Sequence, residues 1–376
     1  MTAAVAPMRG VVRLASAKDN AALIALTAAC PMEGELSLCI DRAPDFFALN
    51  RLEGDRWKVA VVDGPEGAPI ACVATAERRV WLHGRPATIV YTGDLKVHPD
   101  FRDTHTADAL ERFVADVARD TAGSATPILL TVLAGNTSME RRALGPRGLP
   151  RLHRFATLYS FAIPLLWRRR LTETAALRVE NACDGDLEEM ADLWLRVAPS
   201  RQFTATLDAS GLARWIDGAP GLHIDDYLVA RDHQGRLAGF VGIWDQRAIK
   251  TLRVLRYSPG LAVLRGVMNT LGPFVGATPP PAVGLPLPYA SAVHLCVPTD
   301  RVDVMRALVL TAYERLHGSG RVFMNISLDA REALTSALDG LLATPTVIHA
   351  YATTPSGEWT GAPLGDRPLH FETALV

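Results

Sequence analysis

Short runs of hydrophobic, β-prone residues alternate along this chain with segments whose apolar residues recur at helical spacing. In the first half these patterns predict strands at 11–15, 57–62, 70–82, 87–97, 128–133 and 155–163, and helices from Asp19, around 44–52, from Thr106 and from Ser138. Strands interleaved with helices in this way indicate an α/β (α+β) fold, in which helices flank a mixed sheet.

The pattern of the first half recurs in the second half. Segment 13–19 resembles segment 178–184, and the Leu-x-Val strand at 95–97 resembles the one at 295–297. The offset between matching positions grows from 165 to 200 residues, so we expect an insertion in the second half, near 258–290. Self-similarity in order and type predicts two tandem domains, 1–166 and 167–376.

Composition narrows the class of protein further. The 376 residues are 49% hydrophobic and 21% charged, which is typical of a globular chain long enough for two cores. The formal net charge of −1 gives no general attraction to nucleic acid or to an anionic membrane. Five scattered cysteines lack the spacing of a metal site, and no run of about 18 apolar residues predicts a membrane span. We therefore expect a cytoplasmic protein with no metal, nucleic-acid or membrane partner.

The segment Tyr91–Ala107 suggests a binding site. A β-prone run ends at Pro99, a short polar loop headed by Arg102 follows, and a helix with apolar residues at helical spacing begins near Thr106. The first N–H groups of a helix have no internal partner, and the helix dipole favours negative charge there. Such a site suits a pyrophosphate, and the adjoining strand can pair with an extended ligand that contains amides.

The same segment resembles the GNAT acyltransferase superfamily, whose cofactor is usually acetyl-CoA. In that family a strand leads through V-x-P-x-(Y/F)-R into a glycine-rich loop, (R/Q)-x-x-G-x-(G/A), and then a helix. The residues that match are Val97, Pro99, Phe101, Arg102 and Ala107, whereas His105 stands where the first glycine normally lies. The resemblance covers the element order of both halves, and the motif of the first half only. It implies two tandem GNAT-like domains, each with a mixed, mostly antiparallel sheet.

The resemblance also implies a cofactor site for acetyl-CoA or another acyl-CoA. The residues expected to form it are Leu95, Lys96, Val97, Arg102, Asp103, Thr104, His105, Thr106, Ala107 and Asn136. The N–H of Val97 would polarise the thioester carbonyl, with ordinary sheet pairing as the alternative. Thr104 or Thr106 would cap the helix. His105 has three interpretations: a phosphate donor, a helix-start residue without function, or a plug in a loop that no longer binds CoA.

Two residues of the same strand are predicted to be catalytic. Asp94 lies in an apolar run where burial would raise its pKa toward that of a general base; the alternative is a salt bridge with Lys96 or Arg79. Tyr91 would orient the substrate, or else pack in the core. The acceptor is expected to enter past residues 31–50, where Arg42 and four acidic residues form a mostly acidic rim.

Together these features predict an acyl-CoA-dependent N-acyltransferase that transfers an acetyl group to a small amine by direct attack on the thioester. The second half would be a degenerate copy that shapes the acceptor pocket or a homodimer. One alternative is a non-catalytic GNAT-fold binding or scaffold protein that has lost CoA binding. Another is a Fem-type transferase that uses aminoacyl-tRNA, although the near-neutral charge argues against an RNA partner.

Overall fold

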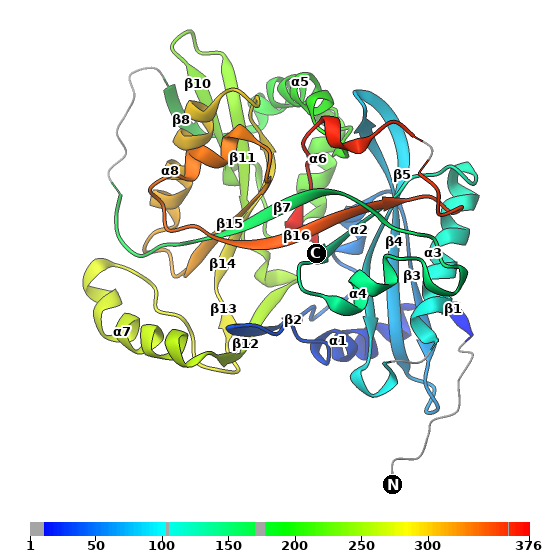
Figure 1. Cartoon of the computed structure of the whole chain (residues 1–376). Coiled ribbons are helices and arrows are strands. Elements are labelled where there is room, and N and C mark those ends of the chain that lie inside the picture. Colours follow the sequence, from blue (N-terminus) through cyan, green and yellow to red (C-terminus); the bar gives the residue numbers. More distant parts are fainter. Residues whose placement is uncertain (1–10, 103–104, 170–176, 360) are drawn as a thin grey trace.

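The computed structural model describes residues 11–102, 105–169, 177–359 and 361–376. One large sheet runs through the whole molecule, with helices on both of its faces (Figure 1). The first half contains β1 Val12–Leu14, α1 Asn20–Ala28, β2 Leu36–Asp41, α2 Asn50–Glu53, β3 Arg56–Asp63, β4 Pro69–Leu82, β5 Arg85–Val97, α3 Thr106–Ala122, β6 Ile128–Leu133, α4 Thr137–Arg142 and β7 His153–Pro164. The second half contains β8 Leu177–Asn181, α5 Leu187–Val197, β9 Thr204–Ala205, α6 Ala209–Gly218, β10 Tyr227–Asp232, β11 Leu237–Trp244, β12 Thr251–Tyr257, α7 Pro259–Val275, β13 Pro286–Leu287, β14 Tyr289–Cys296, α8 Val302–Leu316, β15 Phe323–Asp329 and β16 Thr344–Thr353.

The strand order of the large sheet reads the same from either end. It is β1-β3-β4-β5-β6-β16 followed by β7-β15-β14-β11-β10-β8, with β9 added to β4 off this path. In each half one pair is parallel, β5 with β6 and β14 with β15, and the other pairs are antiparallel. The sequence repeat is therefore a repeat of topology, and the expected mixed, mostly antiparallel sheet is confirmed.

The two halves exchange their last strands. β16 pairs with β6 of the first half, β7 pairs with β15 of the second, and β7 and β16 pair with each other at the centre. Both strands cross the middle of the molecule in Figure 1. The predicted boundary after residue 166 falls between β7 and β8 and stays a prediction, since the sheet is continuous across both halves.

Each half buries both faces of its part of the sheet. On β3, Val59 and Val61 pack toward α1, whereas Ala60 and Val62 pack toward α3. This follows from the alternation of side chains along a strand. In the second half, α8 covers one face and α5 with α6 covers the other. The point where β5 leaves β6, in the interior of the sheet, therefore lies between two packed layers.

A connection of 44 residues joins β11 to β14, where the first half has only a tight turn between β4 and β5. It contains β12, α7 and β13, which agrees with the apolar helix predicted within 258–290. β12 pairs with β13 and also with β2 of the first half, forming a second, three-stranded sheet. β2 was not predicted, and the helix expected around 44–52 is wrong for most of its length, since only Asn50–Glu53 is α-helical.

Candidate functional site

β5 and β6 separate partway along their length, as the predicted site requires. Their parallel pairing covers only Val90 to Thr92, whereas β5 continues to Val97. The N–H of His98 donates to the carbonyl of Ile70 on β4 at 2.8 Å. Because N–H groups alternate in direction along a strand, the N–H of Val97 points away from β4, toward the side where β6 has diverged. This backbone can pair with an extended ligand.

A β-bulge interrupts β5 next to this gap. The pairing of β5 with β4 shifts by one residue between Gly93 and Lys96, so that Val73 alone lies opposite Asp94 and Leu95. A bulge leaves its extra residue out of the regular ladder and redirects the neighbouring backbone groups. The predicted catalytic residue Asp94 therefore lies where β5 is least regular.

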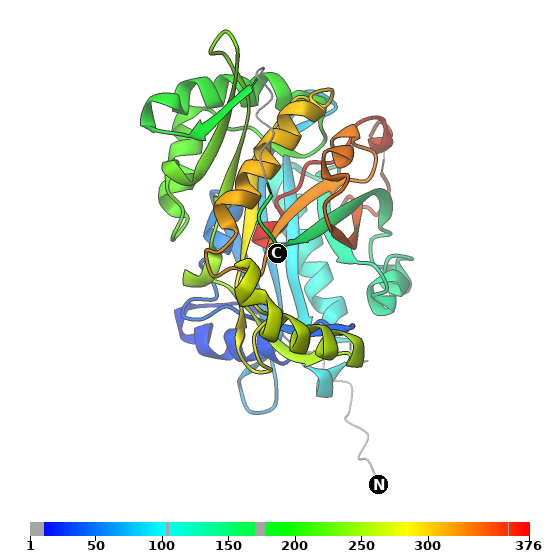
Figure 2. The same cartoon turned by 90° about the vertical axis from the view of Figure 1, so that its left-hand side faces the viewer.

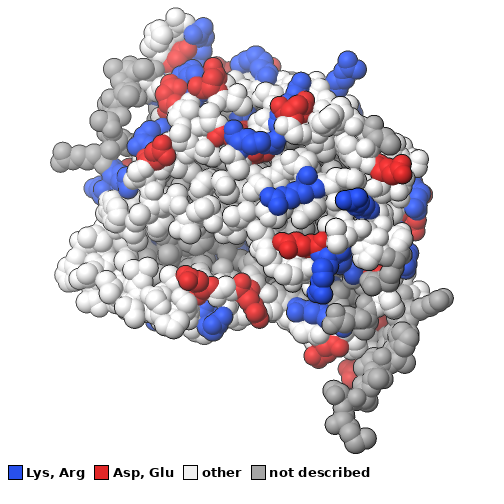
Figure 3. All heavy atoms as spheres, viewed as in Figure 1, with Lys and Arg blue, Asp and Glu red and all other residues white. Residues whose placement is uncertain are grey.

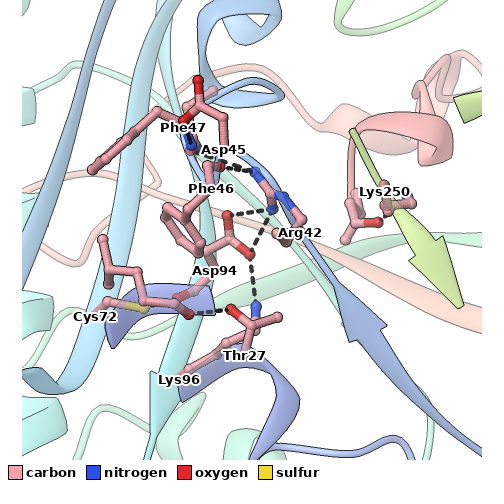
Figure 4. Close-up of polar contacts among 12 residues, drawn as sticks. Thr27, Arg42, Asp45, Phe46, Phe47, Cys72, Asp94, Lys96 and Lys250 are labelled. Carbon is pink, nitrogen blue, oxygen red and sulfur yellow. Dashed lines mark hydrogen bonds and ion pairs between the residues drawn. The ribbon is translucent and has the colours of Figure 1, made fainter. Parts of the chain in front are cut away.

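The Asp94 carboxylate forms a compact ion-pair cluster with two cations. Lys96 Nζ donates to Asp94 at 2.6 Å and Arg42 Nη1 at 3.1 Å (Figure 4). Burial by itself raises the pKa of Asp94, but Lys96 and Arg42 together hold this pKa well below its usual range. The expected raised pKa is thus wrong, because the sequence pattern showed the burial and not both cations. The alternative interpretation, a salt bridge between Asp94 and Lys96, is confirmed.

Arg42 lies inside the protein, and its expected position on an exposed rim is wrong. Its side chain is 2% exposed, its Nη2 donates to the Phe46 carbonyl at 2.6 Å, and its guanidinium lies 4.8 Å from the Phe46 ring. β2 leads directly into Arg42, so the pairing of β2 with β12 fixes the approach of this side chain. One of the two cations that pair with Asp94 thus depends on contact between the two halves.

A narrow crevice lies beside Asp94, with free space for about one water molecule. It is lined by Asn50, Glu53, Trp57, Ala74, Thr75, Ala76, Tyr91, Gly93, Asp94, Leu375 and Val376. Its walls are mostly apolar, and its two carboxylates are both paired with cations, Glu53 with Arg78 and Asp94 with Lys96 and Arg42.

The second half closes one side of the crevice. Lys250, which precedes β12, donates through Nζ to the carbonyls of Ala374 at 2.9 Å and Val376 at 2.6 Å. Gln246 Nε2 also donates to the Ala374 carbonyl, at 2.7 Å. Figure 4 shows Lys250 beyond Arg42. Burial, assisted by the positive charge of Arg42, lowers the pKa of Lys250 to about 7. An amine that is partly neutral near pH 7 therefore lies next to the site.

The start of α3 differs in detail from expectation. The helix N-cap is His105, and Thr106, which we expected as a cap, is instead the first helical residue and is buried together with Ala107. The His105 ring is 58% exposed and lies 3.2 Å from the carboxylate of Asp108, one turn along the helix. Arg102 is exposed at the head of the loop. The predicted contacts of Asp103 and Thr104 lie outside the described residues.

Tyr91 serves the core and the crevice together. It is 4% exposed, packs against Phe371 with ring centroids 5.4 Å apart, and carries the Arg78 guanidinium 4.0 Å from its ring centroid. A Cβ added to Gly93 would lie 3.0 Å from the Tyr91 hydroxyl, so Gly93 leaves room for this ring. Asn136 lies apart from this group: it is exposed and caps α4 by accepting the N–H of Met139 at 3.2 Å.

The second half has the same bulge, and a carboxylate occupies it. The pairing of β14 with β11 shifts so that Val241 alone lies opposite His294 and Leu295, as Val73 does in the first half. The N–H of His294 donates to the carboxylate of Glu372. The N–H at the bulge of this half, at the position equivalent to Asp94, is therefore already bonded within the protein.

Several residues of the site were missed by the sequence analysis. They are Glu53, Trp57, Lys250, Leu375 and Val376, whereas Asn50 lies at the end of the segment expected to admit the acceptor. One signal for Lys250 was available: lysine occurs only at 18, 58, 96 and 250 in this arginine-rich chain, and the structure brings two of the four to one cluster. Within the described residues, no group of three or more metal-binding side chains is present, and no helix is long and apolar enough to cross a membrane.

Comparison with known proteins identifies the fold. No protein-family model and no curated protein matches the sequence. Among solved structures, a GCN5-related N-acetyltransferase from Sphaerobacter thermophilus is 15% identical, with a TM-score of 0.61 over 93% of this chain and 96% of its own. Saccharomyces cerevisiae N-myristoyltransferase with bound myristoyl-CoA is 13% identical, with a TM-score of 0.63 over 94% of this chain and 85% of its own. A probable N-acyltransferase from Enterococcus faecalis is 9% identical, with a TM-score of 0.50 over 94% and 74% of the two chains. The chain therefore has the fold of the GCN5-related N-acetyltransferases, the GNAT fold, in two tandem copies.

Proposed function

We propose that this chain is an acyl-CoA-dependent N-acyltransferase whose active site lies in the first half, with acetyl transfer to a small amine as its reaction. The observation that carries the proposal is the geometry of β5: it leaves β6 after Thr92, turns the N–H of Val97 toward the gap, and has its bulge at Asp94 beside the crevice. An extended amide-containing arm can pair with such a strand, and main-chain N–H groups can stabilise a developing oxyanion.

For acyl transfer from a thioester to an amine, the main contribution of the protein is to position the two reactants. When bound, an acyl-CoA supplies the thioester carbonyl carbon that the amine attacks; the C–N bond forms, the C–S bond breaks, and the CoA thiol leaves with a proton from the amine. The amine is held at the bulge, beside the crevice, and the N–H groups of β5 receive the carbonyl oxygen. Arg102 and the first turn of α3 bind phosphate oxygens.

Asp94 acts in this scheme as a positioning residue. A carboxylate held ionised by Lys96 and Arg42 is a weak base, so water accepts the amine proton. The ion pairs instead fix the bulge, and with it the direction of the N–H groups that face the carbonyl oxygen. Tyr91 forms part of the crevice wall.

Two features support placing the reaction in the first half. At the bulge of the second half, the N–H of His294 is bonded to Glu372, whereas the bulge of the first half lies beside the crevice. His105, which departs from the glycine of the family loop, has φ −77°, a conformation that any residue adopts. Its ring turns toward Asp108, so a histidine here is compatible with a phosphate site.

Calorimetric titration with CoA and acetyl-CoA tests the binding step. We expect saturable binding, weakened roughly 10-fold by Arg102→Ala. Arg119→Ala, at the other end of the same helix, is the matched control and should bind normally. Release of free thiol from acetyl-CoA in the presence of a panel of small amines then tests the transfer. If the wild-type protein shows no heat at millimolar CoA, the non-catalytic alternative replaces this proposal; transfer from aminoacyl-tRNA alone would favour the Fem-type reaction.

A further inference from the structure

Helix α7 contacts the rest of the protein through a single row of residues along one side of the helix. The side chains of Leu261, Arg265 and Met268 are half-buried, and Gly272 is buried, at intervals of three and four residues along the helix. The other positions of the helix are exposed. Figure 1 shows α7 at the margin of the molecule, and in Figure 2, where that side faces the viewer, the helix lies in front of the large sheet. We call residues 251–288, which comprise β12, α7, β13 and their connections, the α7 lobe.

The α7 lobe carries an unusual amount of exposed apolar surface. Of the seventeen exposed large apolar side chains among the described residues, nine belong to it: Leu255, Val263, Leu264, Val267, Leu271, Phe274, Val275, Val283 and Leu285. Phe274 is 86% exposed. Such a concentration of exposed large apolar side chains on one lobe is typical of an interaction surface.

The exposed face of α7 is also uncharged. Arg265 is the only charged residue of the helix, and its Nε is turned inward to the carbonyls of Pro280 and Pro281 at 3.2 and 2.8 Å. The space-filling view shows no charged side chain over α7 (Figure 3). A partner for this face must therefore be apolar and needs no complementary charge.

We propose that the α7 lobe is the interface of a homodimer, in which α7 of one copy packs against α7 of a second copy across a twofold axis. A twofold interface brings the same patch of both subunits together, so the patch must complement itself. A charged patch would repel its own copy, whereas a neutral apolar helix face is its own complement.

Small residues on the exposed face allow two helices to approach closely. Ala262, Gly266 and Thr270 are spaced by four residues and are all exposed. A Cβ added to Gly266 meets no atom within 4 Å, so this part of the face is open. Small residues at such spacing let helix backbones come together, with larger neighbours such as Val263 and Val267 packing alongside.

A lipid surface fits this face less well than a second copy does. Helices that lie in a membrane interface combine an apolar face with lysine and arginine on the polar face. α7 has no lysine, its one arginine is turned inward, and its exposed polar residues are Asn269 and Thr270. The helix lacks the cations that would draw it to anionic lipid headgroups.

Sedimentation velocity of the full chain tests the interface. We expect a species of twice 40.6 kDa for the wild type. We expect Val267→Glu with Phe274→Glu to raise the dimer dissociation constant on the order of 100-fold, because two central apolar contacts are replaced by charge. Leu144→Glu, at an equally exposed site on the turn after α4, is the control and should leave the dimer intact. Circular dichroism should be unchanged in all variants, since the altered side chains are exposed.

A cross-linking experiment locates the contact independently. In a Cys183→Ser background, Gly266→Cys should be joined to its copy by a short bismaleimide, because the twofold axis passes close to this position. The wild-type protein, whose Cys183 is exposed elsewhere, should not be cross-linked. A wild type that stays monomeric up to about 100 µM would overturn the proposal. So would a Val267/Phe274 variant that still dimerises, or a monomeric wild type that floats with phosphatidylcholine vesicles, which would identify lipid as the occupant.

Discussion

Asp94 and His294 occupy equivalent positions in the two halves and share a left-handed backbone, with φ of +52° and +48°. Each lies in the bulge of its strand, opposite a single valine of the neighbouring strand. Side chains other than glycine rarely adopt this conformation, and asparagine, aspartate and histidine do so more readily than others. Their surroundings differ. Asp94 is ion-paired beside the crevice. The His294 ring, in contrast, is buried, and the backbone N–H of His294 donates to the Glu372 carboxylate at 2.9 Å.

Replacing Asp94 by asparagine should separate its charge from its backbone conformation. Asparagine tolerates the left-handed region, so the bulge can persist while Arg42 and Lys96 lose their counter-ion. We expect kcat to fall roughly 10- to 100-fold with CoA affinity unchanged, and the unfolding free energy to fall by about 3 kcal/mol, since a buried arginine is left unpaired. Asp100→Asn, on an exposed carboxylate, is the control. Unchanged turnover in Asp94→Asn would remove this residue from the mechanism.

The free energy of unfolding should decrease at acid pH in part because Asp94 becomes protonated. Its folded-state pKa lies below its unfolded value, so its stabilising contribution is fully present above the unfolded pKa of about 4 and is lost as the pH falls further. Urea unfolding between about pH 3 and pH 6 should therefore show a steeper loss of stability toward acid in the wild type than in Asp94→Asn. Parallel curves would contradict the ion-pair cluster.

Removing the Glu372 carboxylate should affect folding more than catalysis. Glu372→Ala leaves the buried N–H of His294 without its acceptor and opens a small cavity, so we expect a loss of about 3 kcal/mol in unfolding free energy. Glu372→Gln keeps an acceptor oxygen and should lose less. Turnover per folded molecule should stay within about 2-fold of wild type, because the reaction is placed in the first half. A large fall in kcat for Glu372→Gln would assign the second half a part in the reaction.

His105→Gly restores the glycine of the family loop. Because the His105 backbone already has an ordinary φ and its exposed ring turns toward Asp108, we expect the CoA dissociation constant to change by less than about 3-fold. Calorimetry beside Arg102→Ala measures it. Binding that tightens 10-fold or more would mean that the imidazole obstructs the phosphate site, and binding that weakens equally would mean that the ring contacts phosphate.

Lys250→Met should change the slope of stability with pH. The pKa of Lys250 is about 7 in the folded protein and about 10.4 when unfolded, so above pH 7 the unfolded chain binds the extra proton and stability rises with pH. Relative to Lys250→Met, the wild type should gain roughly 2 kcal/mol between pH 7 and pH 9. Paired urea titrations at these two pH values measure the difference. Identical slopes would show that Lys250 stays charged when folded.

The sequence by itself determined the repeated order of strands and helices, the apolar helix of the insertion, and the strand-loop-helix segment around Val97 and Arg102. These features are local, because the period of apolar residues and the placement of proline act within a few turns of chain. They also placed Asp94 correctly on the strand at the edge of the site.

Only the tertiary structure decided which strands the halves exchange, and which side chains meet at Asp94. Arg42, Lys250 and the segment around Val376 are each separated by more than a hundred residues, and no periodicity encodes their meeting. The direction in which the pKa of Asp94 shifts depends on burial and on the neighbouring charges together. The sequence pattern revealed the burial but not the approach of Arg42. The pattern along the chain therefore specified the framework, and long-range packing specified the electrostatics of the site.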